Sequence, residues 1–171
     1  MELQLKGTGS KSNERGNFAR NHSRKKSQIL DRLQAFFLER KHSYALAAQK
    51  KRVRIDEKNF YVDLVFFNRI LSCFVLIDLK IGEITHQDQE QMQMYVNYYD
   101  RCVKLESENP TIGIVLCKKK DDALVELTLP EDNTQIFASK YQTILPNKQE
   151  FAKLLEAKDA EENRMIGEER N

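Results

Sequence analysis

The sequence lacks both a long apolar run and a regular cysteine pattern. No stretch reaches the roughly 18 apolar residues of a membrane-spanning helix, and the N-terminus has no apolar signal-peptide core. The three cysteines, Cys73, Cys102 and Cys117, form no CxxC pair and stand among apolar neighbours. We therefore expect buried, reduced thiols, and a cytoplasmic protein with no membrane segment.

Several catalytic signatures are missing as well. The chain contains no P-loop, no Rossmann glycine pattern and no Ser-His-Asp order, and its three histidines are scattered. These absences argue against an NTPase, a dehydrogenase and a serine hydrolase. They also give no reason to assign a histidine to a metal.

The charge is unevenly distributed, although the net charge of the 171 residues is only +2. Residues 1–27 hold seven Lys/Arg against two Glu, together with three of the six glycines, and show no apolar periodicity. We interpret them as a flexible basic arm, and residues 159–171 as a polar tail. Residues 28–158 are then left as one folded domain.

Apolar periodicity predicts the elements of that domain. A helix is expected from about Ser27 to about Lys41 and a second from Gln87 to Lys104, with shorter helices near 121–127 and 148–158. Strands are expected at 48–55, 60–67, 71–80 and 111–118, with an edge strand near 135–141. The order α-β-β-β-α-β predicts an α/β fold in which helices flank both faces of a mixed central sheet.

Three charged residues interrupt two adjacent hydrophobic strands, where an unpaired charge is costly. They are Asp63, Asp78 and Lys80. A two-residue loop between the strands would leave Asp63 about 13 Å short of Asp78. A four-residue loop, from Arg69 to Ser72, would instead place the two carboxylates opposite each other on one face. The loop length therefore decides whether the three residues can meet.

If they meet, two carboxylates and an ammonium converge at one point. Two hard oxygen ligands suit Mg²⁺, with Mn²⁺ as a substitute. A bound metal could activate water for hydrolysis of a phosphodiester, and Lys80 could hold that water or stabilise the developing charge. Glu39, from the first helix, could add a ligand. The alternative is a structural ion pair, although buried pairs are poor stabilisers.

These residues also carry a family resemblance. The chain has Asp63 and, after fourteen further residues, Asp78-Leu79-Lys80. This order resembles the D…(D/E)-x-K motif of the PD-(D/E)xK nuclease superfamily. More narrowly, NFYVDLVFFNRILSCFVLIDLKIGE (59–83) and MQMYVNYYD (92–100) are similar to the C-terminal nuclease domain of YhcG-type proteins. The similarity covers roughly residues 28–158.

The resemblance implies a restriction-endonuclease-like core and Mg²⁺-dependent cleavage of nucleic acid. Asp63 and Asp78 would be metal ligands, Lys80 the catalytic lysine and Glu39 the helix glutamate of the superfamily. Gln91 and Tyr95 would form its Gln-x-x-x-Tyr element and contact nucleic acid, although both could instead be packing residues. Two departures stand out: Asp78 replaces the Glu of relatives, and only the basic arm precedes the domain, where full YhcG-type proteins carry a winged-helix-like region.

Two basic clusters lie at the ends of predicted strands, where they could contact a nucleic-acid backbone or be ordinary solvated surface. They are Lys51, Arg52 and Arg54 before the acidic strands, and Lys118 and Lys119 after the fourth strand. Our main hypothesis is a Mg²⁺-dependent endonuclease acting on DNA, and by resemblance a homodimer. The alternative is a non-catalytic nucleic-acid-binding or complex-forming module of a larger defence or repair assembly, which would supply target recognition.

Overall fold

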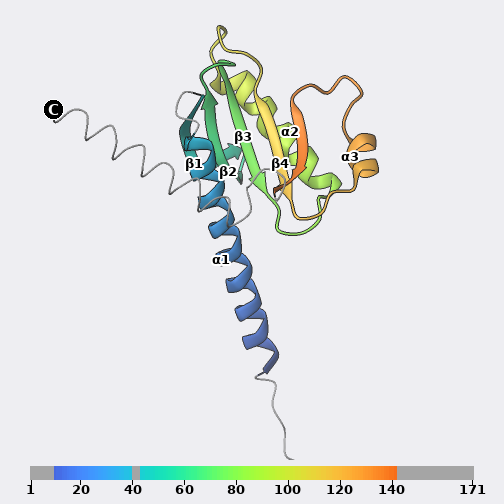
Figure 1. Ribbon diagram of the computed structural model, residues 1–171. Helices are drawn as coiled ribbons and strands as arrows, with labels where there is room; N and C mark the ends of the chain where they lie inside the picture. Colours follow the sequence, from blue (N-terminus) through green and yellow to red (C-terminus); the bar gives the residue numbers. More distant parts are fainter. Residues whose placement is uncertain (1–9, 40–42, 142–171) are drawn as a thin grey trace, which may run out of the picture.

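Residues 10–39 and 43–141 are described in a computed structural model, and they form a five-stranded mixed sheet flanked by helices (Figure 1). The expected helix at 148–158, the tail at 159–171 and the first nine residues of the arm lie outside the described residues. Within the described part, no helix has the length and apolar character needed to cross a membrane.

The strands follow each other across the sheet in chain order, β1-β2-β3-β4-β5. The first two pairings are antiparallel and the last two are parallel. All five expected strands are confirmed, and their bounds are Tyr44–Ile55 (β1), Lys58–Asn68 (β2), Cys73–Leu79 (β3), Ile112–Cys117 (β4) and Ile136–Lys140 (β5).

Three α-helices complete the described fold. They are α1 (Ser10–Glu39), α2 (His86–Tyr98) and α3 (Asp122–Thr128). A π-helical turn, η1 (Tyr99–Val103), extends α2 over most of the expected helix range. The prediction that the first helix begins near Ser27 is wrong, because α1 begins at Ser10 and residues 10–26 are helical rather than irregular. The C-terminal half of α1 packs on the sheet and nucleates the helix, and polar residues can then extend it at little cost in free energy. Apolar periodicity cannot reveal such an extension.

The two long helices cover opposite faces of the sheet, as the α/β prediction required. On one face of the sheet, α1 contributes Ile29, Leu33 and Phe37 to an apolar cluster. The sheet contributes Phe66 and Ile77 to the same cluster. The other face packs against α2 through a second apolar cluster, which includes Met92, Tyr95, Val96, Leu76 and Val115. In Figure 1 the N-terminal part of α1 projects well beyond the sheet.

Gly113 of β4 lies where α2 approaches the sheet closely. A Cβ atom built at this position would lie 2.7 Å from Met92 Cγ and Sδ and 2.8 Å from Val96 Cγ2. These distances are too short for real contacts, so a side chain here would push α2 away from the sheet. The close packing fixes the position of α2, whose N-terminal turn reaches the candidate site described below.

The cysteines are only partly as expected. Cys73 and Cys117 are buried, and burial raises the pKa of both thiols. Cys102 is exposed, so the prediction of a third buried thiol is wrong. Cys102 lies in η1 directly after Asp100 and Arg101, and the end of this turn faces solvent.

Candidate active site

The loop between β2 and β3 sets the register on which the site depends. Asn68 pairs with Cys73, so the loop has the four residues from Arg69 to Ser72. The Asn68 side chain stabilises this turn, because its Oδ1 accepts hydrogen bonds from the backbone N–H groups of Ile70 and Leu71 at 3.0 and 2.9 Å. The longer of the two loops considered from the sequence is therefore confirmed.

This register brings Asp63 and Asp78 to the same place. The paired residues end at Leu64 and Ile77, and the next position along each strand is Asp63 and Asp78. There the regular ladder gives way, and Asp63 Oδ2 accepts a hydrogen bond from the backbone N–H of Leu79 at 2.8 Å. The Asp63 carboxylate thus reaches across to the end of β3.

An irregularity in β1 and β2 aims the Asp63 side chain. Residues two apart on a strand normally share a face, yet Val62 packs in the cluster under α2 while Leu64 packs in the cluster under α1. On β1 the residue between the pairings of Gln49 and Lys51 is Lys50, which has a positive φ of 43°. The two strands therefore change face where Asp63 lies, a local distortion that sequence alternation cannot show.

Each carboxylate has a lysine. Lys80 Nζ lies 2.8 Å from Asp78 Oδ2, and Lys26 Nζ lies 2.9 Å from Asp63 Oδ2. Both aspartates are buried, with 8% of Asp63 and 4% of Asp78 exposed. The arrangement satisfies the rule that buried charges are paired, and it places two cations at two closely spaced carboxylates.

Burial dominates the electrostatics of Asp78. It raises the pKa of this carboxyl from 3.8 to about 6, with the opposing attraction of Lys80 and the added repulsion of Asp63 as the next causes. Both effects of Asp63 raise this pKa, so the two carboxyl groups are close enough to interact. Burial alone would lower the pKa of Lys80, but Asp78 and Asp88 outweigh it and the pKa is raised. Lys80 therefore stays protonated at neutral pH.

Asp88 is a member of the site that sequence reasoning missed. Its Oδ1 lies 3.3 Å from Lys80 Nζ, while its Oδ2 accepts hydrogen bonds from the Thr85 backbone N–H and hydroxyl at 2.8 Å each. Thr85 and Asp88 form the capping box of α2. The sequence signal was present, because Thr-x-x-Asp before a helix is a capping-box pattern. The same pattern here also positions a carboxylate beside Lys80.

Lys26 was missed for a different reason, because it was assigned to an irregular arm. It lies three residues before Ile29, on the continuation of the face of α1 that packs on the sheet. A shallow pocket of about 230 Å³ lies beside its contact with Asp63, and Ser23, Lys50 and Tyr61 contribute to the lining.

Glu39 is not brought to the site. It ends α1, thirteen residues after Lys26, which is about 20 Å along the helix axis at 1.5 Å per residue. Its Oε1 is buried and, within the described residues, has no hydrogen-bond partner. The suggestion that Glu39 adds a metal ligand beside Asp63 therefore does not fit the fold, because α1 meets the site at Lys26 and its C-terminal end lies farther along the sheet.

Tyr95 and Gln91 lie on α2 with different exposure. Tyr95 is buried and donates its hydroxyl to the Tyr61 carbonyl at 3.0 Å. Burial raises the pKa of Tyr95 to about 12, with the Asp78 charge as the second cause, so a protonated phenol lies near the acidic pair. Gln91 is half-buried and lines an open pocket of about 410 Å³ together with Asp88. Burial of Tyr95 argues against direct contact with nucleic acid, whereas Gln91 is accessible.

The basic clusters are exposed and lie near the site. Lys51, Arg52 and Arg54 belong to the part of the β1–β2 hairpin that runs past the end of β3. Lys118 and Lys119 directly follow β4, whose Leu116 pairs with Leu79 and accepts a hydrogen bond from the Lys80 N–H at 2.7 Å. Lys119 also forms an exposed ion pair with Glu83 at 3.5 Å.

The donor set fits a hard divalent cation held by few protein ligands. The described ranges contain no group of three or more His, Cys, Asp or Glu that could hold a metal. Asp63 and Asp78 form a pair, and Mg²⁺ commonly uses one or two carboxylates and keeps several waters. The repulsion between these two carboxyl groups is the interaction that a bound cation would relieve.

Comparison with known proteins identifies the family of the chain that carries this site. The model of the YhcG PDDEXK nuclease domain matches residues 18–156. The chain belongs to this family. It is also 37% identical over 124 residues to "Putative nuclease YhcG" of Escherichia coli (strain K12), a match covering 72% of this chain and 33% of that protein. This YhcG-type domain therefore spans about a third of the length of that curated relative.

Two solved structures are similar to this YhcG-type domain at low identity. One is a repair endonuclease from Pyrococcus abyssi, with 14% identity and a TM-score of 0.41, covering 82% of this chain and 49% of that chain. The other is EndoMS in complex with double-stranded DNA, with 12% identity and a TM-score of 0.41, covering 82% and 48%.

Proposed function

We propose that this YhcG-type domain is a metal-dependent endonuclease that hydrolyses phosphodiester bonds in DNA. The observation that carries the proposal is the convergence of Asp63, Asp78 and Lys80 at the end of β3, inside a member of a nuclease family. Asp63 and Asp78 would hold Mg²⁺, or Mn²⁺ in its place. The metal would supply a water of lowered pKa and neutralise charge on the phosphate.

The protein's own residues have separable roles in this proposal. Lys80 remains a cation, because the pKa of its ammonium is raised, so it acts as a hydrogen-bond donor to the reacting oxygens and not as a base. Asp88, held by Thr85, fixes where the ammonium points. Lys26 would serve as the counter-ion of Asp63 until a metal or a phosphate arrives.

The surface around the site would receive the substrate. Lys51, Arg52, Arg54, Lys118 and Lys119 are exposed near the end of β3, where they can contact phosphates. Gln91 adds an accessible amide beside Asp88. We expect contacts to the backbone rather than base recognition, and target selection would fall to a partner or to further sequence. A homodimer and a cytoplasmic location stay predictions from the sequence.

The decisive experiment compares wild type with Asp78→Asn on linear duplex, single-stranded and branched DNA, in Mg²⁺, Mn²⁺ or EDTA. Asn preserves the shape of the buried side chain, and circular dichroism would verify that the variant is folded. Metal-dependent products from wild type that disappear in the variant are expected. Equal cleavage by both proteins would remove Asp78 from the mechanism, and folded wild type without products on any substrate would favour a binding module.

A further inference from the structure

One face of α1 continues from the packed half of the helix into the projecting half. Ile29, Leu33 and Phe37 are buried on this face against the sheet. Steps of three or four residues back along the helix keep the same face. They lead from Ile29 or Leu33 to Lys26, then to His22, Phe18 and Arg15. We call these four residues the α1 stripe.

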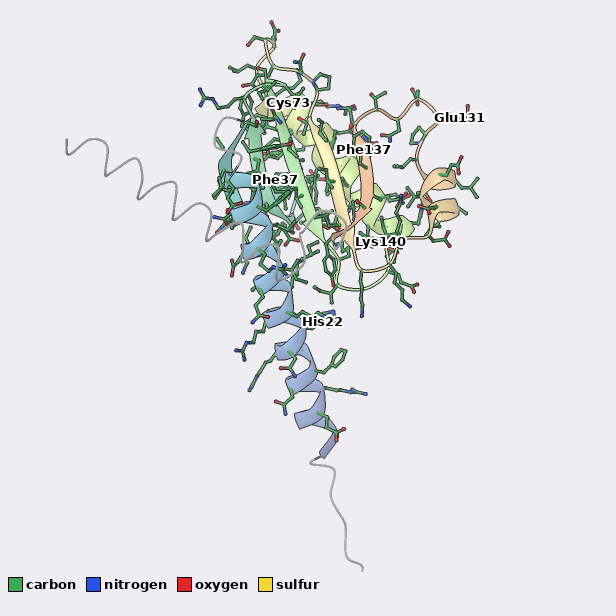
Figure 2. The ribbon with its side chains drawn as sticks, viewed as in Figure 1. His22, Phe37, Cys73, Glu131, Phe137 and Lys140 are labelled. Carbon is green, nitrogen blue, oxygen red and sulfur yellow. The ribbon has the colours of Figure 1, made fainter. Side chains whose placement is uncertain are left out.

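The composition of this face changes where the helix leaves the sheet. Arg15, Phe18 and His22 are all exposed, and Phe18 is a large apolar side chain with 70% of its surface exposed. The Phe18 and His22 rings lie with their centroids 5.6 Å apart. Figure 2 shows His22 on the part of α1 that lies outside the packed body. The stripe thus presents paired rings between two cationic side chains.

The stripe leads directly into the candidate active site. Lys26, at its inner end, contacts Asp63, and the pocket of about 230 Å³ lies at this junction. Ser23, Ser27 and Lys50 also line that pocket, so its wall is rich in hydrogen-bond donors. From Arg15 to Lys26 the helix rises about 16 Å, which matches the rise of about five nucleotides of one DNA strand in a duplex.

We propose that the α1 stripe binds the nucleic-acid strand that enters the active site. This inference rests on the proposed function and specifies how the substrate is held. Arg15 and Lys26 would contact phosphates, and Phe18 with His22 would offer a stacking surface to a base. A pair of rings flanked by cations suits a nucleic acid, because bases stack on rings and phosphates pair with cations. A protein partner would more simply be met by a continuous exposed apolar face, whereas Phe18 is the one large apolar side chain of the stripe.

A matched pair of arginine substitutions tests the proposal. Arg15 lies on the stripe, and Arg24, nine residues later, lies on the opposite side of α1 and is also exposed. Binding of fluorescent duplex and single-stranded oligonucleotides would be measured by anisotropy at several salt concentrations, in the cleavage-deficient Asp78→Asn protein. Arg15→Gln should lower the slope of log affinity against log salt by about 1, whereas Arg24→Gln should leave it unchanged.

A second substitution separates stacking from charge. Phe18→Leu keeps the side chain apolar and should weaken binding of single-stranded DNA about fivefold or more, with a smaller effect on duplex. Equal losses from Arg15→Gln and Arg24→Gln would reduce the stripe to general charge attraction and overturn the proposal. A second result would also overturn the proposal: Phe18→Leu leaves DNA binding unchanged, but sedimentation shows that it dissociates a dimer. The stripe would then be a protein interface.

The outcomes also distinguish this inference from the proposed function. If wild type cleaves DNA but Arg15→Gln binds it like the parent protein, the stripe proposal fails and the nuclease proposal stands. If the stripe substitutions weaken binding but wild type cleaves nothing with any metal, the nuclease proposal fails and the stripe is the surface of a binding module.

Discussion

The two sides of the site hold their lysines in different ways. On the α2 side, Lys80 pairs with Asp78 and Asp88, and its backbone N–H is bonded to Leu116. On the α1 side, Lys26 pairs with Asp63 from a helix whose preceding residues are exposed. One ammonium is anchored by a strand end and a capping box, and the other extends from a projecting helix. The difference suggests that Lys80 is a permanent part of the site and Lys26 a displaceable counter-ion.

The strongest test of this contrast removes the anchored lysine. Lys80→Met should lower kcat about a hundredfold to a thousandfold, because the site loses a donor aimed at the developing charge. The protein should remain folded, since Met retains the length of the apolar stem. Single-turnover cleavage of the preferred DNA substrate would measure the loss. Activity within a fewfold of wild type would show that Lys80 serves structure and not chemistry.

The next test uses pH, because Asp78 must lose its proton to bind a cation. With its pKa near 6, metal affinity should fall by up to tenfold for each pH unit below 6 and level off above 7. Titration calorimetry with Mn²⁺ would follow this dependence.

Asp78 should also make the stability of the metal-free protein depend on pH, but in the direction opposite to that of metal affinity. A carboxyl whose pKa is raised on folding binds its proton more tightly in the folded state, so stability should fall as pH rises from about 4 to about 6. Saturating metal should reverse that trend. A metal affinity that does not vary between pH 5 and 7 would contradict the assignment of Asp78 as a ligand.

Asp88→Asn should have a smaller effect, because Asn can still cap α2 through its side-chain oxygen. Loss of the negative charge removes one of the causes that raise the pKa of Lys80, and it frees the ammonium to move. We expect about a tenfold decrease in kcat with KM little changed. The fall in rate at the basic end of the pH–rate profile should begin at a lower pH, because Lys80 loses its proton more easily. A uniform loss at all pH values with lowered thermal stability would instead indicate that Asp88 acts only through the helix cap.

The smallest effect is expected for a substitution of Lys26, and this substitution should strengthen metal binding rather than impair function. Lys26→Met removes an ammonium that competes with a cation for Asp63, so Mn²⁺ affinity should rise about two- to fivefold, as for a partly exposed ion pair. Calorimetry in the absence of DNA isolates this effect from substrate binding. Weaker metal binding in the variant would show that Lys26 supports the Asp63 carboxylate instead of blocking it.

The sequence alone determined the strands of the sheet and the candidate acidic residues, but it left open the loop length that brings those residues together. Strands with apolar residues in both alternation phases required helices on both faces, and the structure has them. An even-numbered loop predicted that Asp63 and Asp78 share a face, and the register that ends at Leu64 and Ile77 makes them the next opposing positions. The approach of Lys80 to Asp78 followed from the same alternation.

The rest was decided only in three dimensions. Local sequence did not show that α1 continues back to Ser10, since an exposed helix carries no apolar period. Once that extension forms, Lys26 reaches Asp63 while Glu39 ends about 20 Å away, because a rigid helix fixes the separation of its residues. Asp88 reaches Lys80 from the first turn of α2, a helix that packs closely over Gly113. Periodicity predicts which face a residue shares, but contacts between distant elements depend on where helices begin, end and pack.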